Sequence, residues 1–232
     1  MTRRREFLKG AALGAGLLAL RASADEKKPA KPGAAGDDED VSPAEDLMRE
    51  HGVLKRVFLV YREALRRLEG AAELPPEPVA EAADVIRTFI EDYHEKLEEE
   101  FLFPRFRKAK KEVGLVDVLQ AQHAAGRRLT DATLRLAKGG APRSVEERRA
   151  WADPLAAFVR MYEPHEARED TILFPAFRRI VSAHEWDALG DDFEKREHQL
   201  FGGDGFEKMV DRVASIEKRL GIYDLSQFTP KA

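Results

Sequence analysis

The sequence contains one motif twice, and this internal repeat constrains the fold more than any other feature. Residues 94–107 and 165–178 both follow the pattern H-E-x-x-E-x-x-x-L-F-P-x-F-R, at an offset of 71 residues. Upstream of each copy stands a single histidine, His51 in the first case and His123 in the second. We therefore predict a duplicated pair of helices, each pair with one single histidine and one His-x-x-x-Glu motif. Such a set of side chains is typical of a metal site.

Four stretches of the chain place their apolar residues on one helical face, and in each stretch a histidine of the repeat lies on that face. These stretches are residues 47–68, 79–101, 115–134 and 151–172. Four helices in up-down order would bring these histidine faces to a common interior, so we predict an all-α fold, an up-down four-helix bundle. Two further helices, near residues 185–200 and 206–220, have no counterpart in the repeat and are expected to pack outside the bundle.

Several residues mark the ends and irregularities of these helices. Ser42 and Ser144, each followed three residues later by glutamate, predict capping boxes at the first and fourth helices. Prolines 154 and 164 predict that the fourth helix starts late or bends. The repeated Leu-Phe-Pro-x-Phe segment is expected to end or kink each helix. Gly126, one turn beyond His123, is expected to leave room beside the imidazole.

The N-terminal residues predict an export signal rather than part of the fold. Residues 4–9 (Arg-Arg-Glu-Phe-Leu-Lys) resemble the twin-arginine signal, and a short apolar run and an A-x-A cleavage site at residues 22–24 follow. We therefore expect the protein to be exported, with a periplasmic location. The predicted division is a twin-arginine signal peptide at 1–24, a disordered linker at 25–41, the four-helix bundle at 42–181 and a C-terminal helical extension at 182–232.

Composition limits both the chemistry and the partners. The chain has no cysteine, which excludes disulfides, thiolate metal sites and cysteine nucleophiles, so any metal must be held by imidazole and carboxylate groups. Cleavage after Ala24 would change the net charge from −4 to −8. We expect no nucleic-acid partner and no stable membrane insertion after cleavage, because a chain this acidic repels both nucleic acid and anionic membranes. The oligomeric state stays open.

The spacing within each His-x-x-x-Glu motif directs both side chains towards one point. Residues four apart on a helix differ by roughly 40° in direction, so His94 and Glu98 can share a target, as can His165 and Glu169. Two ions that share Glu98 and Glu169 as bridges would each receive two histidines and two bridging oxygens. Nitrogen and oxygen ligands without sulfur favour iron, with manganese or zinc as alternatives.

These elements resemble the hemerythrin-like family, the HHE cation-binding domain, over about residues 42–181. The resemblance implies a non-haem di-iron centre in an up-down four-helix bundle. It also implies how two iron ions are held: His51 and His94 serve one iron, His123 and His165 serve the other, and Glu98 and Glu169 bridge them.

The sequence departs from the classical oxygen carriers of that family. Those proteins have a second histidine four residues after the histidine of the third helix, where this chain has Arg127. They also have an aspartate five residues after the last histidine. Asp170 stands at that position here, directly after Glu169. We prefer Glu169 to Asp170 as the second bridge because it mirrors the glutamate of the first motif. Glu95 and Glu166, directly after their histidines, could each supply an additional oxygen ligand.

The expected function is that of an exported di-iron protein that binds O2 or a related small molecule, for sensing, delivery or scavenging. The smaller number of nitrogen ligands also allows a second function, a di-iron peroxidase or oxidase in oxidative defence of the cell envelope. Iron storage is a third. The sequence does not decide whether the protein is an enzyme.

Overall fold

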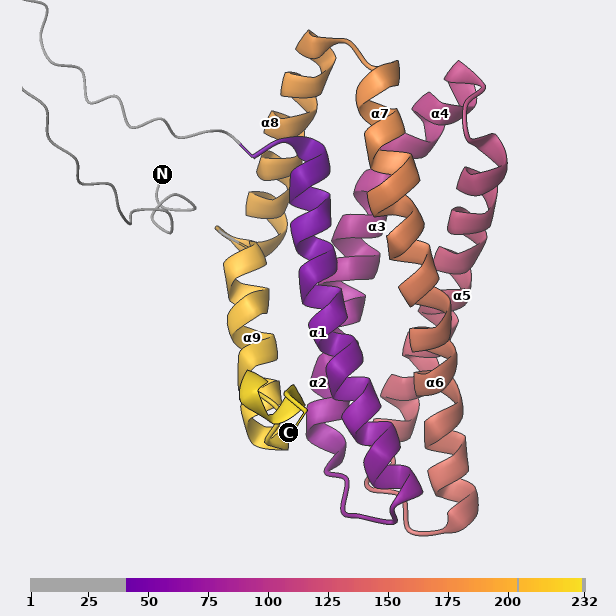
Figure 1. The fold of residues 1–232 in the computed structure, drawn as a ribbon, viewed down its shortest axis with the longest axis vertical. Coiled ribbons are helices and arrows are strands. Elements are labelled where there is room, and N and C mark those ends of the chain that lie inside the picture. Colours follow the sequence, from indigo (N-terminus) through magenta and orange to yellow (C-terminus); the bar gives the residue numbers. More distant parts are fainter. Residues whose placement is uncertain (1–40, 204, 231–232) are drawn as a thin grey trace, which may run out of the picture. The chain divides into compact units, whose positions relative to one another are not determined.

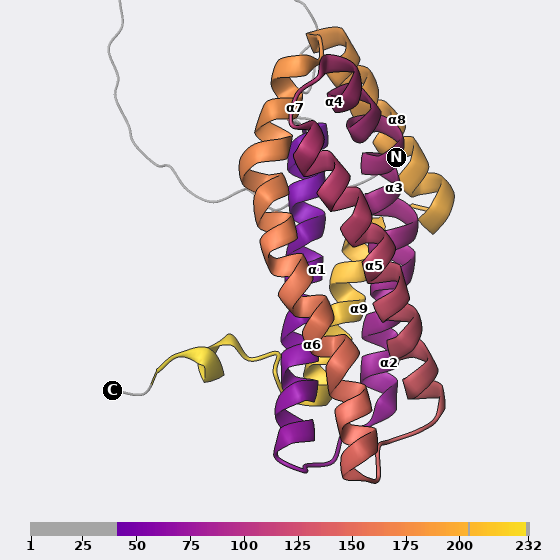
Figure 2. The same cartoon turned by 90° about the vertical axis from the view of Figure 1, so that its right-hand side faces the viewer.

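The computed structural model describes residues 41–203 and 205–230. The predicted signal peptide lies outside the described residues, as does the predicted linker except for Val41. Four helical runs build the fold, and Figures 1 and 2 show them side by side. The first run is α1 (Pro43–Glu69), and the second joins α2 (Pro76–Val85), η1 (Ile86–His94), α3 (Glu95–Leu97), η2 (Glu98–Leu102) and α4 (Phe103–Ala109). The third run is α5 (Val113–Lys138), and the fourth joins α6 (Val145–Arg168), η3 (Glu169–Leu173) and α7 (Phe174–Ile180).

Successive runs are antiparallel, and each contacts two neighbours. Helix α1 packs against α2 and α6, and α5 packs against the same two helices from the other side. Leucine, valine, phenylalanine and tyrosine side chains from all four runs fill the space between them, including the fully buried Tyr61, Tyr93 and Phe158. This arrangement confirms the predicted all-α, up-down four-helix bundle.

Two further helices follow the repeat. Helices α8 (Ala183–Phe201) and α9 (Gly205–Leu220) both contact α1, and α9 also contacts α2. A short 3-10 turn, η4 (Leu225–Phe228), follows α9. The apolar face of α9 is buried through Val213 and Ile216. An ion pair from Arg56 Nη2 to Glu217 Oε2, 2.5 Å long, joins α1 to α9. These C-terminal helices therefore cover the outer side of the first two runs.

Helix α6 begins where its capping box predicts. The Ser144 hydroxyl accepts a hydrogen bond from the Glu147 backbone N–H at 3.1 Å, and the Glu147 carboxylate accepts one from the Ser144 N–H at 3.1 Å. Of the two alternatives that the prolines predicted, a late start or a bend, the late start is wrong, because the helix begins at Val145 and contains both Pro154 and Pro164. The box satisfies the first amide donors, and the burial of Trp151 holds the early turns in the bundle. At α1, Ser42 accepts from the Glu45 N–H at 3.3 Å.

The repeated Leu-Phe-Pro segments do not end their helices. Pro104 and Pro175 lie in the first turns of α4 and α7, which continue the runs. Directly before them lie the π-helical segments η2 and η3. Proline has no N–H and its ring clashes with the carbonyl four residues earlier, and a wider π turn accommodates it. Glu98 and Glu169 are the first residues of these π-helical segments, which helical periodicity alone did not predict.

Candidate metal centre

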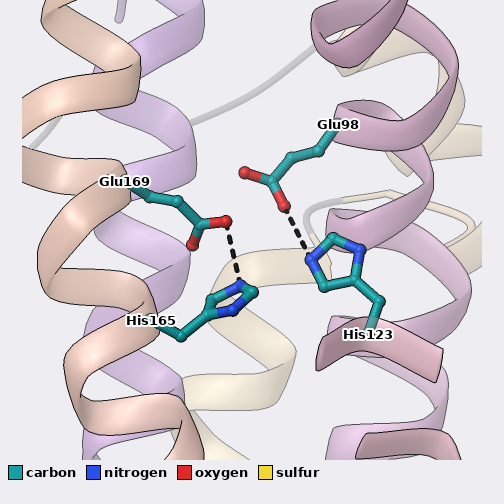
Figure 3. A group of neighbouring side chains, drawn as sticks. All are labelled: Glu98, His123, His165 and Glu169. Atoms are coloured by element: carbon teal, nitrogen blue, oxygen red, sulfur yellow. Dashed lines mark ion pairs between the residues drawn. The ribbon is translucent and has the colours of Figure 1, made fainter. Parts of the chain in front are cut away.

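The structure brings the six predicted ligands together in the interior of the bundle. Each comes from a different element, and each is at most 3% exposed. The six are His51 (α1), His94 (η1), Glu98 (η2), His123 (α5), His165 (α6) and Glu169 (η3). Figure 3 shows four of them, with Glu98 facing His123 and Glu169 facing His165. One potential ligand atom from each of these four lies within 4.8 Å of the others, and the same holds for His51, His94 and Glu169.

Each carboxylate lies between histidines of the two predicted pairs. Glu98 Oε2 is 3.8 Å from Nε2 of His94 and 3.4 Å from Nε2 of His123. On the other side, Glu169 Oε2 is 3.4 Å from Nε2 of His51 and Oε1 is 2.9 Å from Nε2 of His165. Each carboxylate therefore reaches one histidine from each pair. A side chain that bridges two sites would need this position.

The polar atoms at this centre fit a cation. Both carboxylate oxygens of Glu98, both of Glu169 and Nε2 of His123 are buried without a hydrogen-bond partner among the described residues. Buried carboxylates without compensation cost several kcal/mol. Since the donor set is imidazole nitrogen and carboxylate oxygen, a transition-metal ion would satisfy these atoms.

The outer nitrogen of every imidazole is held by a side-chain oxygen. His94 Nδ1 lies 2.7 Å from Glu50 Oε2, and His165 Nδ1 lies 2.8 Å from Gln122 Oε1. Such partners fix the ring orientation and leave the other nitrogen, Nε2, for a metal. Both partners directly precede a single histidine of the repeat, so each of these contacts stays within one half of it.

The two single histidines take their partners from the opposite half of the repeat. His51 Nδ1 lies 2.8 Å from Asp170 Oδ1, and His123 Nδ1 lies 3.1 Å from Glu99 Oε1. Asp170 and Glu99 are themselves 71 residues apart and follow the two bridging candidates. The contact of Glu99 with His123 was not predicted, although the position of Glu99 in the repeat, equivalent to that of Asp170, was the available signal.

The additional candidate ligands lie beside the six inner side chains, and one of them, Glu95, has a potential ligand atom within 4.8 Å of atoms of Glu99 and His123. Asp170 accepts from the outer nitrogen of His51, so its geometry favours Glu169 as the inward-facing carboxylate. Glu166 is 2% exposed, and its Oε1 lies 3.5 Å from Lys55 Nζ. The same ammonium lies 3.6 Å from Asp170 Oδ2. We call Lys55, Glu166 and Asp170 the Lys55 cluster.

Glu95 belongs to a second group of outer residues. The Tyr162 hydroxyl donates a hydrogen bond to Glu95 Oε1 at 2.5 Å, and Arg127 Nη2 donates to Glu95 Oε2 and Glu99 Oε1, both at 2.7 Å. We call Arg127, Glu95, Glu99 and Tyr162 the Arg127 cluster. A Cβ atom at Gly126 would lie 2.1 Å from the Tyr162 hydroxyl. The space at Gly126 is therefore used by this phenol, a contact that the sequence did not predict.

These contacts shift the pKa values of the centre. Burial lowers the pKa of His51, but the adjacent carboxylates of Asp170 and Glu169 outweigh burial and raise the pKa to about 10. Burial also lowers the pKa of His123, but the charge of Glu95 and the neighbouring carboxylates of Glu98 and Glu99 outweigh it, and the pKa rises to about 10. Burial, followed by the charge of Glu169, raises the pKa of Glu98 to about 8. A cation that binds here must displace protons from these groups.

Comparison with known proteins agrees with this geometry. The family model of the hemerythrin HHE cation-binding domain matches residues 42–177. Uncharacterized proteins of Mycobacterium tuberculosis and Mycobacterium bovis are 48% identical over 233 residues, which cover 98% of this chain and 91% of each relative. No solved structure matches the chain.

The chain belongs to the hemerythrin HHE cation-binding family. Membership implies a metal-binding site, and the buried histidine and glutamate groups are placed to hold a metal.

Proposed function

We propose that this centre holds two iron ions and that the protein binds O2 or a related small molecule for sensing, delivery or scavenging. One ion would be held by His51 and His94 and the other by His123 and His165, with Glu98 and Glu169 between them. The observation that carries this proposal is the position of each carboxylate between histidines of both pairs. When bound, two ferrous ions would supply the electrons and the open coordination positions with which a diatomic ligand or a peroxide reacts.

The residues of the chain position and protect the site. The outer oxygens of Glu50, Gln122, Glu99 and Asp170 orient the four imidazoles. Burial of all six inner side chains keeps bulk water away. The bundle therefore presents a preorganised set of ligands to the ions.

A second function, a di-iron peroxidase or oxidase, is favoured by one particular observation. Arg127 occupies the position where oxygen carriers of the family have another histidine, and its guanidinium is engaged by Glu95 and Glu99. With one fewer nitrogen ligand, oxidation chemistry competes with reversible binding. Iron storage would instead require more than two irons per chain.

The test is metal analysis with an optical spectrum of protein purified without oxygen and then exposed to air. Two irons per chain and a spectral change that reverses under vacuum support binding; irreversible oxidation with turnover of peroxide and an electron donor supports the enzyme. The variants His51→Ala and His123→Ala should each lower the iron content. His184→Ala, at an exposed position outside the bundle, is the matched control. Failure of the parent chain to take up iron would refute the centre.

Export through the twin-arginine pathway is part of the same proposal and rests on residues 4–24. Among the described residues, no helix is both long and apolar enough to cross a membrane. Replacing Arg4 and Arg5 by lysine should retain the protein in the cytoplasm, as measured by cell fractionation. Unchanged export of that variant would contradict the twin-arginine route.

A further inference from the structure

Five exposed cations lie together at one end of the bundle, where the two copies of the repeated motif finish. We call this group the basic end. Three of its residues lie at the end of α4 and in the turn to α5, and two lie in the last turn of α7: Lys108, Lys110, Lys111, Arg178 and Arg179. Figure 1 shows the ends of α4 and α7 next to each other, far from the connection between α5 and α6.

The internal repeat holds the two basic segments side by side. Phe106 and Phe177 occupy equivalent positions in the repeat, and both are fully buried. Their ring centroids are 5.9 Å apart. In each copy the basic residues begin directly after this phenylalanine. A contact in the core therefore brings charges from both halves of the repeat to one part of the surface.

The cations of the basic end are not neutralised by neighbouring side chains. None of the five forms an ion pair with a carboxylate of the residues that the structure describes. The guanidinium of Arg178 lies instead over the Trp186 ring, 5.0 Å from its centre. Long cations on the sides of the bundle are held differently, as in the pair between Arg56 and Glu217.

The acids around the basic end leave it with a net positive charge. Asp117 and Glu185 already pair with arginines beside it, at 2.9 and 2.8 Å. The other two acids that adjoin it in the sequence, Glu112 and Asp187, are exposed. Five cations and these two acids give this end a net charge of +3, although the whole chain carries −4.

The turn that carries the lysines has an uncommon backbone. Lys110 and Glu112 have φ angles of 55° and 47°, in the left-handed region that residues other than glycine rarely adopt. Residues held in this region cluster at segments that contact ligands or act as switches. The turn therefore keeps side chains at positions where glycine would be less strained.

The position of the basic end suits a flat, negatively charged surface. A plane that touches one end of the helices does not meet their sides, and charges more than about 8 Å away are screened at physiological salt. Such a surface therefore interacts with the local positive charge rather than with the net charge of the chain. A single-stranded nucleic acid would instead need a positively charged groove along which its backbone can lie. The basic end is a compact patch at the tips of two adjoining segments.

We propose that the basic end docks the protein, without insertion, on a membrane surface that contains anionic phospholipids. Each lysine or arginine near such a surface strengthens binding about fivefold. The inference goes beyond the proposed metal function and does not depend on it.

The test uses the absence of cysteine in the full chain. Ala109→Cys, an exposed site within the basic end, carries a single dye that is sensitive to its surroundings, and Ala141→Cys carries the same dye at the opposite end. Vesicles of phosphatidylcholine with phosphatidylglycerol should change the emission at position 109 far more than at position 141. Vesicles of phosphatidylcholine alone should change neither. The response of the labelled chain should fall as salt is added.

Two double variants then test the charges in the Ala109→Cys chain. Lys108→Gln with Lys111→Gln should raise the lipid concentration for half-maximal response about ten- to thirtyfold. Arg135→Gln with Lys138→Gln removes the same charge at the far end of α5, where both residues are exposed, and is the matched control that should leave it unchanged. Helical circular dichroism is compared first for all variants.

Several results would overturn the docking surface. One is an equal response at positions 109 and 141, and another is equal binding to vesicles without phosphatidylglycerol. Equal losses in the two double variants would show a general charge effect instead. Tighter binding of a single-stranded oligonucleotide at the same phosphate concentration would assign the basic end to nucleic acid. A response that does not weaken with salt would exclude the electrostatic contact.

Discussion

The Arg127 and Lys55 clusters occupy equivalent positions in the repeat but differ in how tightly they are built. Lys55 and Arg127 each follow a single histidine by four residues, and each faces two carboxylates of the repeated motif. The contacts of Arg127 are 2.7 Å long, whereas those of Lys55 are 3.5 and 3.6 Å long. The Arg127 side chain is 26% exposed and that of Lys55 is 54% exposed. One side of the centre is therefore clamped, and the other is accessible to solvent.

The difference arises from a few substitutions within a shared frame. Tyr162, which closes the Arg127 cluster, has Glu91 as its counterpart 71 residues earlier. Glu91 instead contacts Arg87 at 2.7 Å and accepts a hydrogen bond from Thr130 at 2.6 Å. The comparison teaches that a duplicated set of inner side chains can keep its symmetry while the surrounding residues make its two sides chemically different.

The largest expected effect is that of removing the clamp. Arg127→Ala would leave the buried carboxylate of Glu95 without its cation and Glu99 with Lys96 alone, and we expect a loss of about 2–4 kcal/mol in the free energy of unfolding. Lys55→Ala should change it by less than about 0.5 kcal/mol, because its ion pairs are long and exposed. Urea unfolding of both variants measures the difference. Equal losses of unfolding free energy in the two variants would show that the Arg127 and Lys55 clusters stabilise the fold equally.

Gly126→Ala tests the same clamp from the backbone. The new Cβ would clash with the Tyr162 hydroxyl, so we expect a loss of about 1–3 kcal/mol in the free energy of unfolding. Gly52→Ala is the control, since a Cβ at that exposed position in α1 would meet nothing within 4 Å beyond its chain neighbours and the backbone of its own helix. Its expected effect is a gain of about 0.5–1 kcal/mol. A stable Gly126→Ala protein would show that Tyr162 can move away.

The outer carboxylates provide a smaller comparison. Glu99→Gln and Asp170→Asn each remove the charge that holds a single histidine, and metal affinity should fall about 10- to 100-fold. We expect the greater loss of metal affinity for Glu99→Gln, because Arg127 and Lys96 also bind Glu99 and hold it in place. The side chain of Glu99 is also less exposed than that of Asp170, at 13% against 24%. Competition with a chelator measures both affinities. The opposite order would contradict the tighter coupling of the Arg127 side.

The smallest expected effect is a pH dependence. The pKa values of His51 and His123 rise from 6.5 to about 10, so their contribution to metal-free stability is present below pH 6.5 and is lost as pH rises through 10. Glu98, raised from 4.5 to about 8, acts in the same direction. Bound metal displaces these protons. The gap in melting temperature between loaded and metal-free protein should therefore widen by about 3 °C or more from pH 6.5 to 10. A difference in melting temperature that narrows between these pH values would contradict the raised pKa values of His51, His123 and Glu98.

The sequence alone determined the helices, their order and the types of the inner side chains. Periodicity places His51 and His165 on buried helix faces, and the spacing of four joins each histidine of the repeat to its own glutamate, because both features depend only on local helix geometry. The capping box at Ser144 is local in the same way.

Only the tertiary structure decided what lies between helices. It placed Glu98 beside His123 and Glu169 beside His51, and it paired the single histidines with Glu99 and Asp170 of the opposite half. It also introduced the π-helical turns before the prolines, clamped the Arg127 side and left a pocket at Lys55. These features depend on how four helices pack against one another, and side chains far apart in sequence acquire neighbours only when the bundle forms.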